Sequence, residues 1–217
     1  MDRMVEIFEN SEAANLLRAR LPYLFQLAEI DCSRAHKVGM EVGSLRERIL
    51  IAFLINHFGK KNVQTEIPIT EHETDVKLFN QPVSIKTITG AGRVKMAWTV
   101  DRLKSREFLE NYKPKCAILL VHIRWGCVGG LFYIPLEAQT RVFKELGRAR
   151  YLNLPKEGTN PRGVDINPEA LLKLISQHDT RRIDINWQLS TITNYSPYDR
   201  WLDHWNGKNE SQVERKT

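Results

Sequence analysis

Cysteine is scarce in this sequence, and the few cysteines present are far apart. The 217 residues contain three, Cys32, Cys116 and Cys127. An odd number without any C-x-x-C pair supports neither a disulfide framework nor a zinc knuckle. We therefore expect a protein of a reducing, cytoplasmic setting.

Long apolar runs are missing as well. No run reaches the roughly 18 residues that a membrane-spanning helix needs. The N-terminal segment carries Asp2, Glu6 and Glu9, where a secretory signal would have basic and then apolar residues. Internal repeats and low-complexity tracts are also lacking, so the sequence predicts a globular protein without a membrane anchor.

Positive charge is present in excess. Lys and Arg total 32 against 26 Asp and Glu, which gives a formal net charge of +6. With 42% hydrophobic and 27% charged residues, the composition is ordinary for a globular protein, and the length fits one domain. The basic balance favours an anionic partner, with nucleic acid as the first candidate.

Hydrophobic periodicity changes between helical and strand spacing along the chain. Ser11 is expected to cap the first helix and Pro22 to kink it. The expected helices are 11–30, 44–58, 99–111, 135–147, 168–176 and 196–205, and the expected strands are 63–69, 74–79, 82–88, 116–123, 131–134 and 182–187. This order predicts an α/β (α+β) fold, a mixed central β-sheet flanked by helices. We assign residues 1–205 to a single domain and 206–217 to a polar C-terminal tail.

The two strands before residue 90 are expected to form a hairpin. With Asn80-Gln81 as the turn, residues whose numbers sum to 161 lie opposite each other, which places Asp75 opposite Lys86. Because side chains alternate, Asp75, Lys77, Ser84 and Lys86 share one face, and Val76, Leu78, Val83 and Ile85 share the other. An exposed cross-strand ion pair explains Asp75 and Lys86 as well as a functional site does.

Glu47 is the second unusual residue, because its helix is apolar on almost every side. A carboxylate in such a helix must interact with one of three things: a partner side chain, the helix N-terminus or a metal ion. Two interpretations are open: Glu47 closes a capping box with Ser44, or it belongs to a site.

These residues resemble the PD-(D/E)xK nuclease superfamily, and within it the type II restriction endonucleases. The resemblance rests on G-S-L-R-E-R-I-L-I-A-F-L-I, then E-T-D-V-K-L-F, then V-S-I-K-T, in residues 41–90. It implies a catalytic core at about 41–135. The whole chain is also similar to a restriction enzyme that cuts at CGCG, which implies a short palindromic, CG-rich target.

The resemblance implies Mg²⁺-dependent hydrolysis of double-stranded DNA, with Glu47, Asp75 and Lys86 as the catalytic residues. Glu47, Asp75 and the backbone carbonyl of Ile85 are the implied metal ligands. Mg²⁺ prefers oxygen ligands and needs only one or two carboxylates. Ser84 departs from the family pattern, because it stands where the motif has its middle acid, and this puts a two-metal site in doubt.

DNA contacts are expected from four basic and polar loop residues, Arg93, Lys95, Asn160 and Arg162. A solvated surface position is the alternative explanation for each of them. Met96 fits either a wedge between base steps or core packing. A palindromic target calls for a two-fold homodimer. Tyr198, Trp201, Leu202 and Trp205 fall on one helical face, so a partner contact there is open.

Three other interpretations compete with the restriction endonuclease. The first is a structure-selective repair or junction nuclease of the same superfamily. The second is a non-catalytic DNA-binding protein in which Ser84 marks a decayed site. The third is an α/β domain with an exposed Asp75–Lys86 ion pair and no nuclease function.

Overall fold

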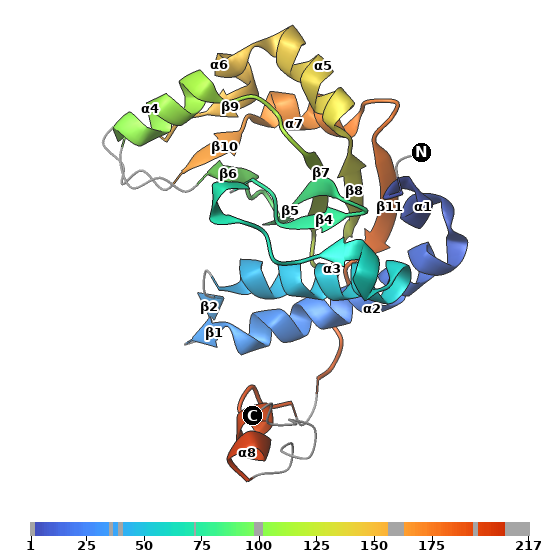
Figure 1. The fold of residues 1–217 in the computed structure, drawn as a ribbon. Helices are drawn as coiled ribbons and strands as arrows, with labels where there is room; N and C mark the ends of the chain where they lie inside the picture. Colours follow the sequence, from blue (N-terminus) through green and yellow to red (C-terminus); the bar gives the residue numbers. More distant parts are fainter. Residues whose placement is uncertain are drawn as a thin grey trace, which may run out of the picture.

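The computed structural model describes residues 3–34, 37–38, 41–71, 73–97, 102–155, 163–192 and 195–206. Within these ranges no helix is both long enough and apolar enough to cross a membrane. Figure 1 shows a central sheet with helices above and below it.

A six-stranded mixed sheet forms the centre, in the order β11-β8-β7-β5-β4-β3. Only β5 and β7 run parallel; the other neighbours are antiparallel. The strands are β3 (Val63–Gln64), β4 (Val76–Leu78), β5 (Gln81–Thr89), β7 (Ala117–Ile123), β8 (Val128–Ile134) and β11 (Arg181–Asn186). The mixed sheet flanked by helices confirms the predicted fold class.

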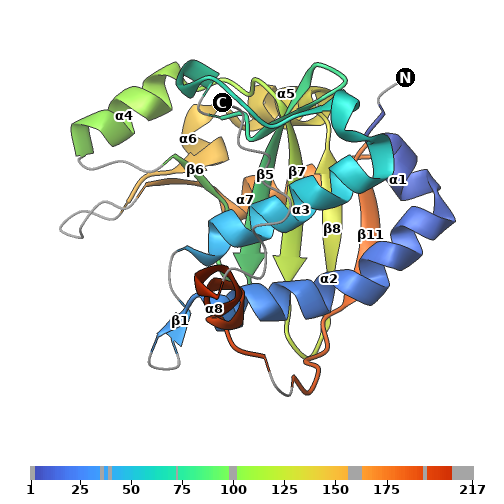
Figure 2. The same cartoon turned by 60° about the horizontal axis from the view of Figure 1, so that its bottom comes forward.

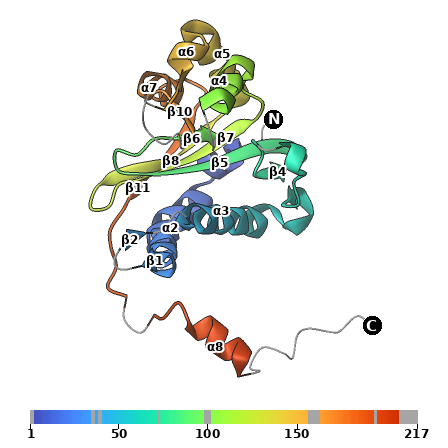
Figure 3. The ribbon, with the colours of Figure 1, turned by 90° about the vertical axis from the view of Figure 1, so that its left-hand side faces the viewer.

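The helices fall into two layers, as Figures 2 and 3 show from other sides. The first layer contains α1 (Val5–Glu9), α2 (Ser11–Asp31) and α3 (Val42–Phe58). The second contains α4 (Arg102–Asn111), α5 (Leu136–Leu146), α6 (Arg148–Tyr151) and α7 (Pro168–Ile175). A final helix, α8 (Asp199–Trp205), stands away from both layers.

Strand alternation divides the core in two. Leu119, Val121 and Ile123 of β7 pack toward the layer of α1 to α3, whereas Ile118 and Leu120 pack toward α5 to α7. Because β7 is buried on both faces, it reads as a continuous apolar run rather than an alternating one.

Two smaller sheets complete the fold. The strands β6 (Lys95–Ala97), β10 (Val164–Ile166) and β9 (Leu152–Asn153) form a three-stranded sheet beside the second layer. The strands β1 (Ser33–Arg34) and β2 (Lys37–Val38) form a short pair after α2.

The register predicted for the hairpin is wrong by two residues. The turn consists of Phe79 and Asn80, both with positive φ (47° and 65°), and Leu78 pairs with Gln81. A two-residue hairpin turn favours positive φ at both positions, which Asn tolerates and Phe resists. Packing overrides that resistance, because the Phe79 ring meets Phe58 edge-on at 5.7 Å between centroids and the Phe79 amide donates to the Asn62 carbonyl at 2.8 Å.

Helix starts also differ from the prediction. Asn10, not Ser11, caps α2 and accepts hydrogen bonds from the amides of Glu12 and Ala13. Pro22 lies inside α2, which continues as one helix to Asp31. The next helix begins at Val42, two residues before Ser44, and shows no side-chain cap.

A strand was predicted at 63–69, but only Val63 and Gln64 pair in the sheet. Ile69 begins a short 3-10 helix. The opposite error occurs at 95–97, where a strand lies in a segment predicted as a loop.

Candidate active site

The carboxylate of Asp75 is held by the strand that follows it. Asp75 lies immediately before β4, and its amide donates to the Val83 carbonyl at 3.0 Å. Its Oδ2 accepts hydrogen bonds from the Ile85 amide at 2.6 Å and the Ser84 hydroxyl at 3.1 Å. Two donors on one oxygen fix the orientation of the carboxylate and leave Oδ1 without a hydrogen bond from any described residue.

Lys86 reaches the same carboxylate. Its Nζ lies 3.6 Å from Asp75 Oδ2, and both side chains are 20% exposed. The observed pairing ends at Val76–Val83, and Asp75 accepts hydrogen bonds from Ser84 and Ile85, so Lys86 reaches it from the next residue of β5. The two-residue shift preserves the faces of the hairpin, and so the pair predicted from the sequence forms despite the wrong register.

Glu47 does not cap its helix. Since α3 begins at Val42, the capping-box interpretation with Ser44 is wrong. Burial raises the pKa of Glu47 first, and the negative charge of Asp75 raises it further, while the charges of Lys86 and Arg48 lower it. The charges of Asp75 and Lys86 thus act on Glu47, and a cation bound nearby would favour its ionised form.

Arg46 positions this part of α3, and it is a residue that the sequence analysis missed. It is 5% exposed, donates through Nη1 to the Thr89 hydroxyl at 3.1 Å and pairs with Glu29 through Nη2. The Trp125 indole donates to the same Glu29 carboxylate at 3.0 Å. An arginine in an otherwise apolar helix was the available signal, because a buried guanidinium needs a carboxylate partner.

The backbone of Ile85 completes the candidate site. The Gly90 amide donates to the Ile123 carbonyl of β7. On the opposite edge of β5, the Val83 carbonyl accepts from the Asp75 amide. Since N–H and C=O of one strand residue point to the same edge, the odd-numbered residues of β5 face the β4 side. The pairing between β4 and β5 ends at Val76–Val83. The Ile85 carbonyl therefore points past the end of β4, toward Asp75.

This donor set fits a divalent cation with oxygen ligands. In the part of the chain that the structure describes, no three His, Cys, Asp or Glu side chains form a metal-binding group. Two carboxylates and one carbonyl remain, which is what Mg²⁺ takes when it keeps several waters. Zinc, which favours His and Cys, does not fit these ligands.

Cys116 lies beside the cluster but is no nucleophile. Its thiol donates to the Glu73 carbonyl at 3.5 Å. Burial, followed by the negative charge of Glu73, raises the pKa of Cys116 to about 11. A thiol with that pKa stays protonated at neutral pH and lacks thiolate reactivity.

The predicted DNA contacts have different surroundings. Lys95 Nζ pairs with Asp165 Oδ1 at 2.6 Å, across β6 and β10, and Arg93 lies 3.9 Å from the other oxygen of Asp165. Asp165 is buried, so Lys95 contributes to holding the small sheet together, whereas the Arg93 side chain is 53% exposed. Asn160 and Arg162 lie outside the described residues. Met96 is 9% exposed and packs in the second core, which confirms the core alternative.

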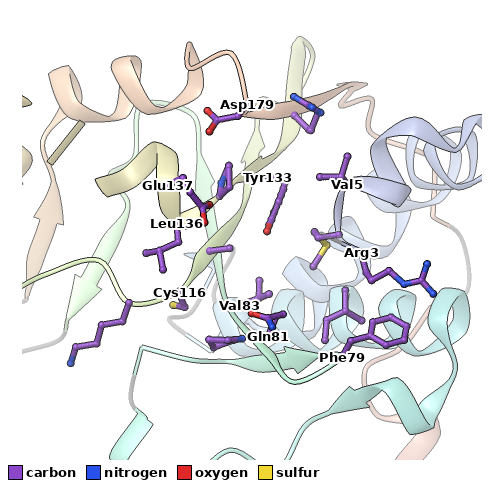
Figure 4. Close-up of a pocket in the computed structure, with 17 residues that line it drawn as sticks. Arg3, Val5, Phe79, Gln81, Val83, Cys116, Tyr133, Leu136, Glu137 and Asp179 are labelled. Atoms are coloured by element: carbon purple, nitrogen blue, oxygen red, sulfur yellow. The ribbon is translucent and has the colours of Figure 1, made fainter. Parts of the chain in front are cut away.

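A cavity of about 720 Å³ lies at the turn end of the hairpin. Arg3, Phe79, Cys116, Glu137 and Asp179 are among its lining residues (Figure 4). Glu47, Asp75 and Lys86 do not line it.

The mixed sheet, the helical acid and the Asp–Lys hairpin define a nuclease of the restriction-endonuclease type. The family model for restriction endonuclease ThaI matches residues 7–207 of this chain. The chain belongs to the ThaI restriction endonuclease family, and it is a site-specific endodeoxyribonuclease.

A solved structure, described as a restriction endonuclease in complex with substrate DNA, is 50% identical to this chain. The match covers 95% of this chain and 100% of the other, with a TM-score of 0.88. No curated protein sequence matches significantly. Family membership favours the restriction endonuclease over the junction nuclease and the non-catalytic binder.

Proposed function

We propose that this chain hydrolyses double-stranded DNA at a short palindromic, CG-rich site, CGCG, with Mg²⁺ as its cofactor. Glu47, Asp75 and the Ile85 carbonyl would hold the ion, and Lys86 completes the catalytic set. One observation carries the proposal. The Asp75 carboxylate contacts both the Lys86 ammonium group and the Ile85 amide, and Ile85 lies beyond the last residue pair of β4 and β5.

When bound, Mg²⁺ supplies charge neutralisation at the phosphate and a water of lowered pKa. Asp75 contributes a carboxylate whose direction is fixed by Ile85 and Ser84. Lys86 contributes a mobile ammonium group close to the same point, which stabilises the negative charge that develops on the phosphate during displacement. The distance of 3.6 Å between Lys86 Nζ and Asp75 Oδ2 supports this role of the ammonium group.

Ser84 gives the site less negative charge than the family motif does. Its hydroxyl donates to Asp75, and the residue is 1% exposed. With Glu47 and Asp75 as the carboxylates of the site, we propose that one ion is bound. Ser84 then acts on the orientation of Asp75 and not on the ion.

Ser84→Ala tests that role. The Ile85 amide still holds Asp75 Oδ2 in this variant, so we expect kcat to fall by about tenfold to a hundredfold, the equivalent of one hydrogen bond to a charged group. Steady-state cleavage in Mg²⁺ measures it. A loss of about a thousandfold would instead place the hydroxyl among the essential groups.

Glu47→Gln tests the helical acid. The change keeps shape and removes the charge, so we expect the Mg²⁺ concentration for half-maximal cleavage to rise at least about tenfold, since hard cations prefer carboxylates. Titration of Mg²⁺ in cleavage assays, and of Mn²⁺ binding by its paramagnetic signal, measures this shift. Glu41→Gln, at an exposed position before the same helix, is the matched control. An unchanged metal requirement in Glu47→Gln would remove Glu47 from the ligand set.

A palindromic target read by identical subunits requires a two-fold assembly, and we propose a homodimer. Arg93, Lys95, Asn160 and Arg162 are the proposed contacts to DNA. Arg pairs bidentately with guanine, which suits a CG-rich site.

A plasmid digest tests the proposed function directly. Two fully sequenced plasmids, identical except that one lacks CGCG, are incubated with the protein in Mg²⁺ and in EDTA. Discrete fragments from the first plasmid alone, only in Mg²⁺, are expected, and their mapped ends give the cut position. Discrete cutting elsewhere would overturn CGCG and keep the endonuclease, whereas cutting in EDTA would overturn the metal.

A further inference from the structure

The C-terminal helix α8 is an arm that stands off the body of the protein. In Figures 1 and 3 it lies beyond α2 at the end of an extended segment. The family model ends at residue 207 and so includes α8, which makes the arm part of the sequence that defines the family.

The root of the arm is fixed to α2. The Gln26 side chain donates to the Ser190 carbonyl at 2.9 Å and accepts from the Ser190 amide at 2.8 Å. Farther along, the Tyr195 hydroxyl donates to Asp31 Oδ1 at 2.5 Å. These bonds set the direction in which the chain leaves the body.

The arm exposes large apolar side chains on one face. Tyr198 is 70% exposed, Leu202 54% and Trp205 90%, and Trp201, at the same helical spacing, is 56% exposed. Isolated helices shorter than about 12–15 residues are marginal in water. The seven-residue α8 therefore needs a surface that covers this face.

The outer face of α2 offers such a surface. Leu16 and Tyr23 are 41% and 40% exposed, and Arg20 lies between them at helical spacing. Asp199 is exposed in the first turn of α8. Both faces are apolar, and Asp199 of α8 and Arg20 of α2 carry opposite charges, so a contact between these two residues would be favourable.

We propose that α8 of one copy docks on the outer face of α2 in a second copy, and that the two arms are exchanged reciprocally. This inference rests on the homodimer proposed above. Buried aromatic side chains contribute about 150–250 Å² each, so two arms bury on the order of 1,000 Å², the size at which specific interfaces begin.

Sedimentation equilibrium of the full-length protein tests the arm. For Trp205→Ala we expect the dimer dissociation constant to rise at least about tenfold, because a central aromatic anchor is lost. Leu172→Ala, which truncates a 65% exposed leucine on α7, is the matched control and is expected to change the constant by less than about twofold.

Charge reversal identifies the partner surface. Arg20→Asp and Asp199→Arg are each expected to weaken the dimer by about threefold or more, and the double variant to restore it in part. A second test oxidises the double variant Trp205→Cys/Tyr23→Cys, in which disulfides between two copies are expected.

The outcomes separate the two proposals. A wild-type protein that stays monomeric, even with CGCG duplex, would overturn both the homodimer and the docked arm. A wild-type dimer with an unchanged dissociation constant in Trp205→Ala would overturn only the arm. A disulfide formed within one chain would show that α8 folds back onto its own α2, and would also overturn the exchange.

Discussion

Replacing Asp75 with asparagine is expected to abolish DNA cleavage and to leave DNA binding intact. The amide keeps the shape that accepts the Ile85 and Ser84 hydrogen bonds but removes the charge that a divalent cation needs. Without the charge on this fixed ligand, we expect kcat to fall by about a thousandfold or more. Binding is expected to stay equal or to become tighter, because a negative charge close to the DNA phosphates has been removed.

Two measurements on the same preparation separate these effects. Cleavage is followed at saturating Mg²⁺, and binding is followed by fluorescence anisotropy of a CGCG duplex in EDTA. Asp184→Asn, at an exposed position of β11 whose carboxylate pairs with Arg182, is the matched control and is expected to cut normally. Full cleavage by Asp75→Asn would refute the assignment of the active site.

The proximity of Asp75 and Lys86 was predictable because the alternation of side chains on a strand tolerates a register error of two residues. A shift of two residues changes every cross-strand neighbour but preserves which side chains share a face. The turn itself was not predictable from turn residues, since it places Phe79 at positive φ and is held there by contacts with Phe58 and Asn62.

The proposed metal site was predictable only in part. Glu47 is conspicuous as a carboxylate in an apolar helix. Whether it caps the helix or belongs to a site depends on the residue at which α3 begins, and one serine does not specify that residue. The carbonyl of Ile85 depends on the residue at which β4 stops pairing, which no side-chain pattern reveals. Its role came from the family resemblance alone.

Short strands account for the other differences. The three residues of β6 are too few for alternation to be recognised, and β6 is defined by pairing with β10, about 70 residues later in the chain. Conversely, the alternation at 63–69 contains Pro68, which disfavours a paired strand. Only Val63 and Gln64 find a partner there, in β4.

Replacing Gly129 with alanine is expected to destabilise the protein more than any other single methyl group added at a described glycine. A Cβ at Gly129 would lie 2.1 Å from the His122 carbonyl oxygen and 2.6 Å from the Trp187 indole nitrogen. The first contact is with the backbone of β7, which pairs with β8 and cannot move away cheaply. Trp187 is fully buried and packs at 5.6 Å between ring centroids against Phe25. The methyl group must therefore displace the sheet or this core.

We expect Gly129→Ala to lower the free energy of unfolding by about 3 kcal/mol, the upper end of overpacking effects. At about 2–4 °C per kcal/mol for a chain of this size, Tm falls by about 10 °C. Gly43→Ala is the matched control, because a Cβ there meets nothing within 4 Å and the position lies in α3, so stability is expected to be equal or up to about 1 kcal/mol higher. Thermal denaturation followed by circular dichroism measures both variants. Equal Tm values for the two would mean that β7 and Trp187 yield to the methyl group, and that the close approach of β7, β8 and Trp187 is not a rigid part of the fold.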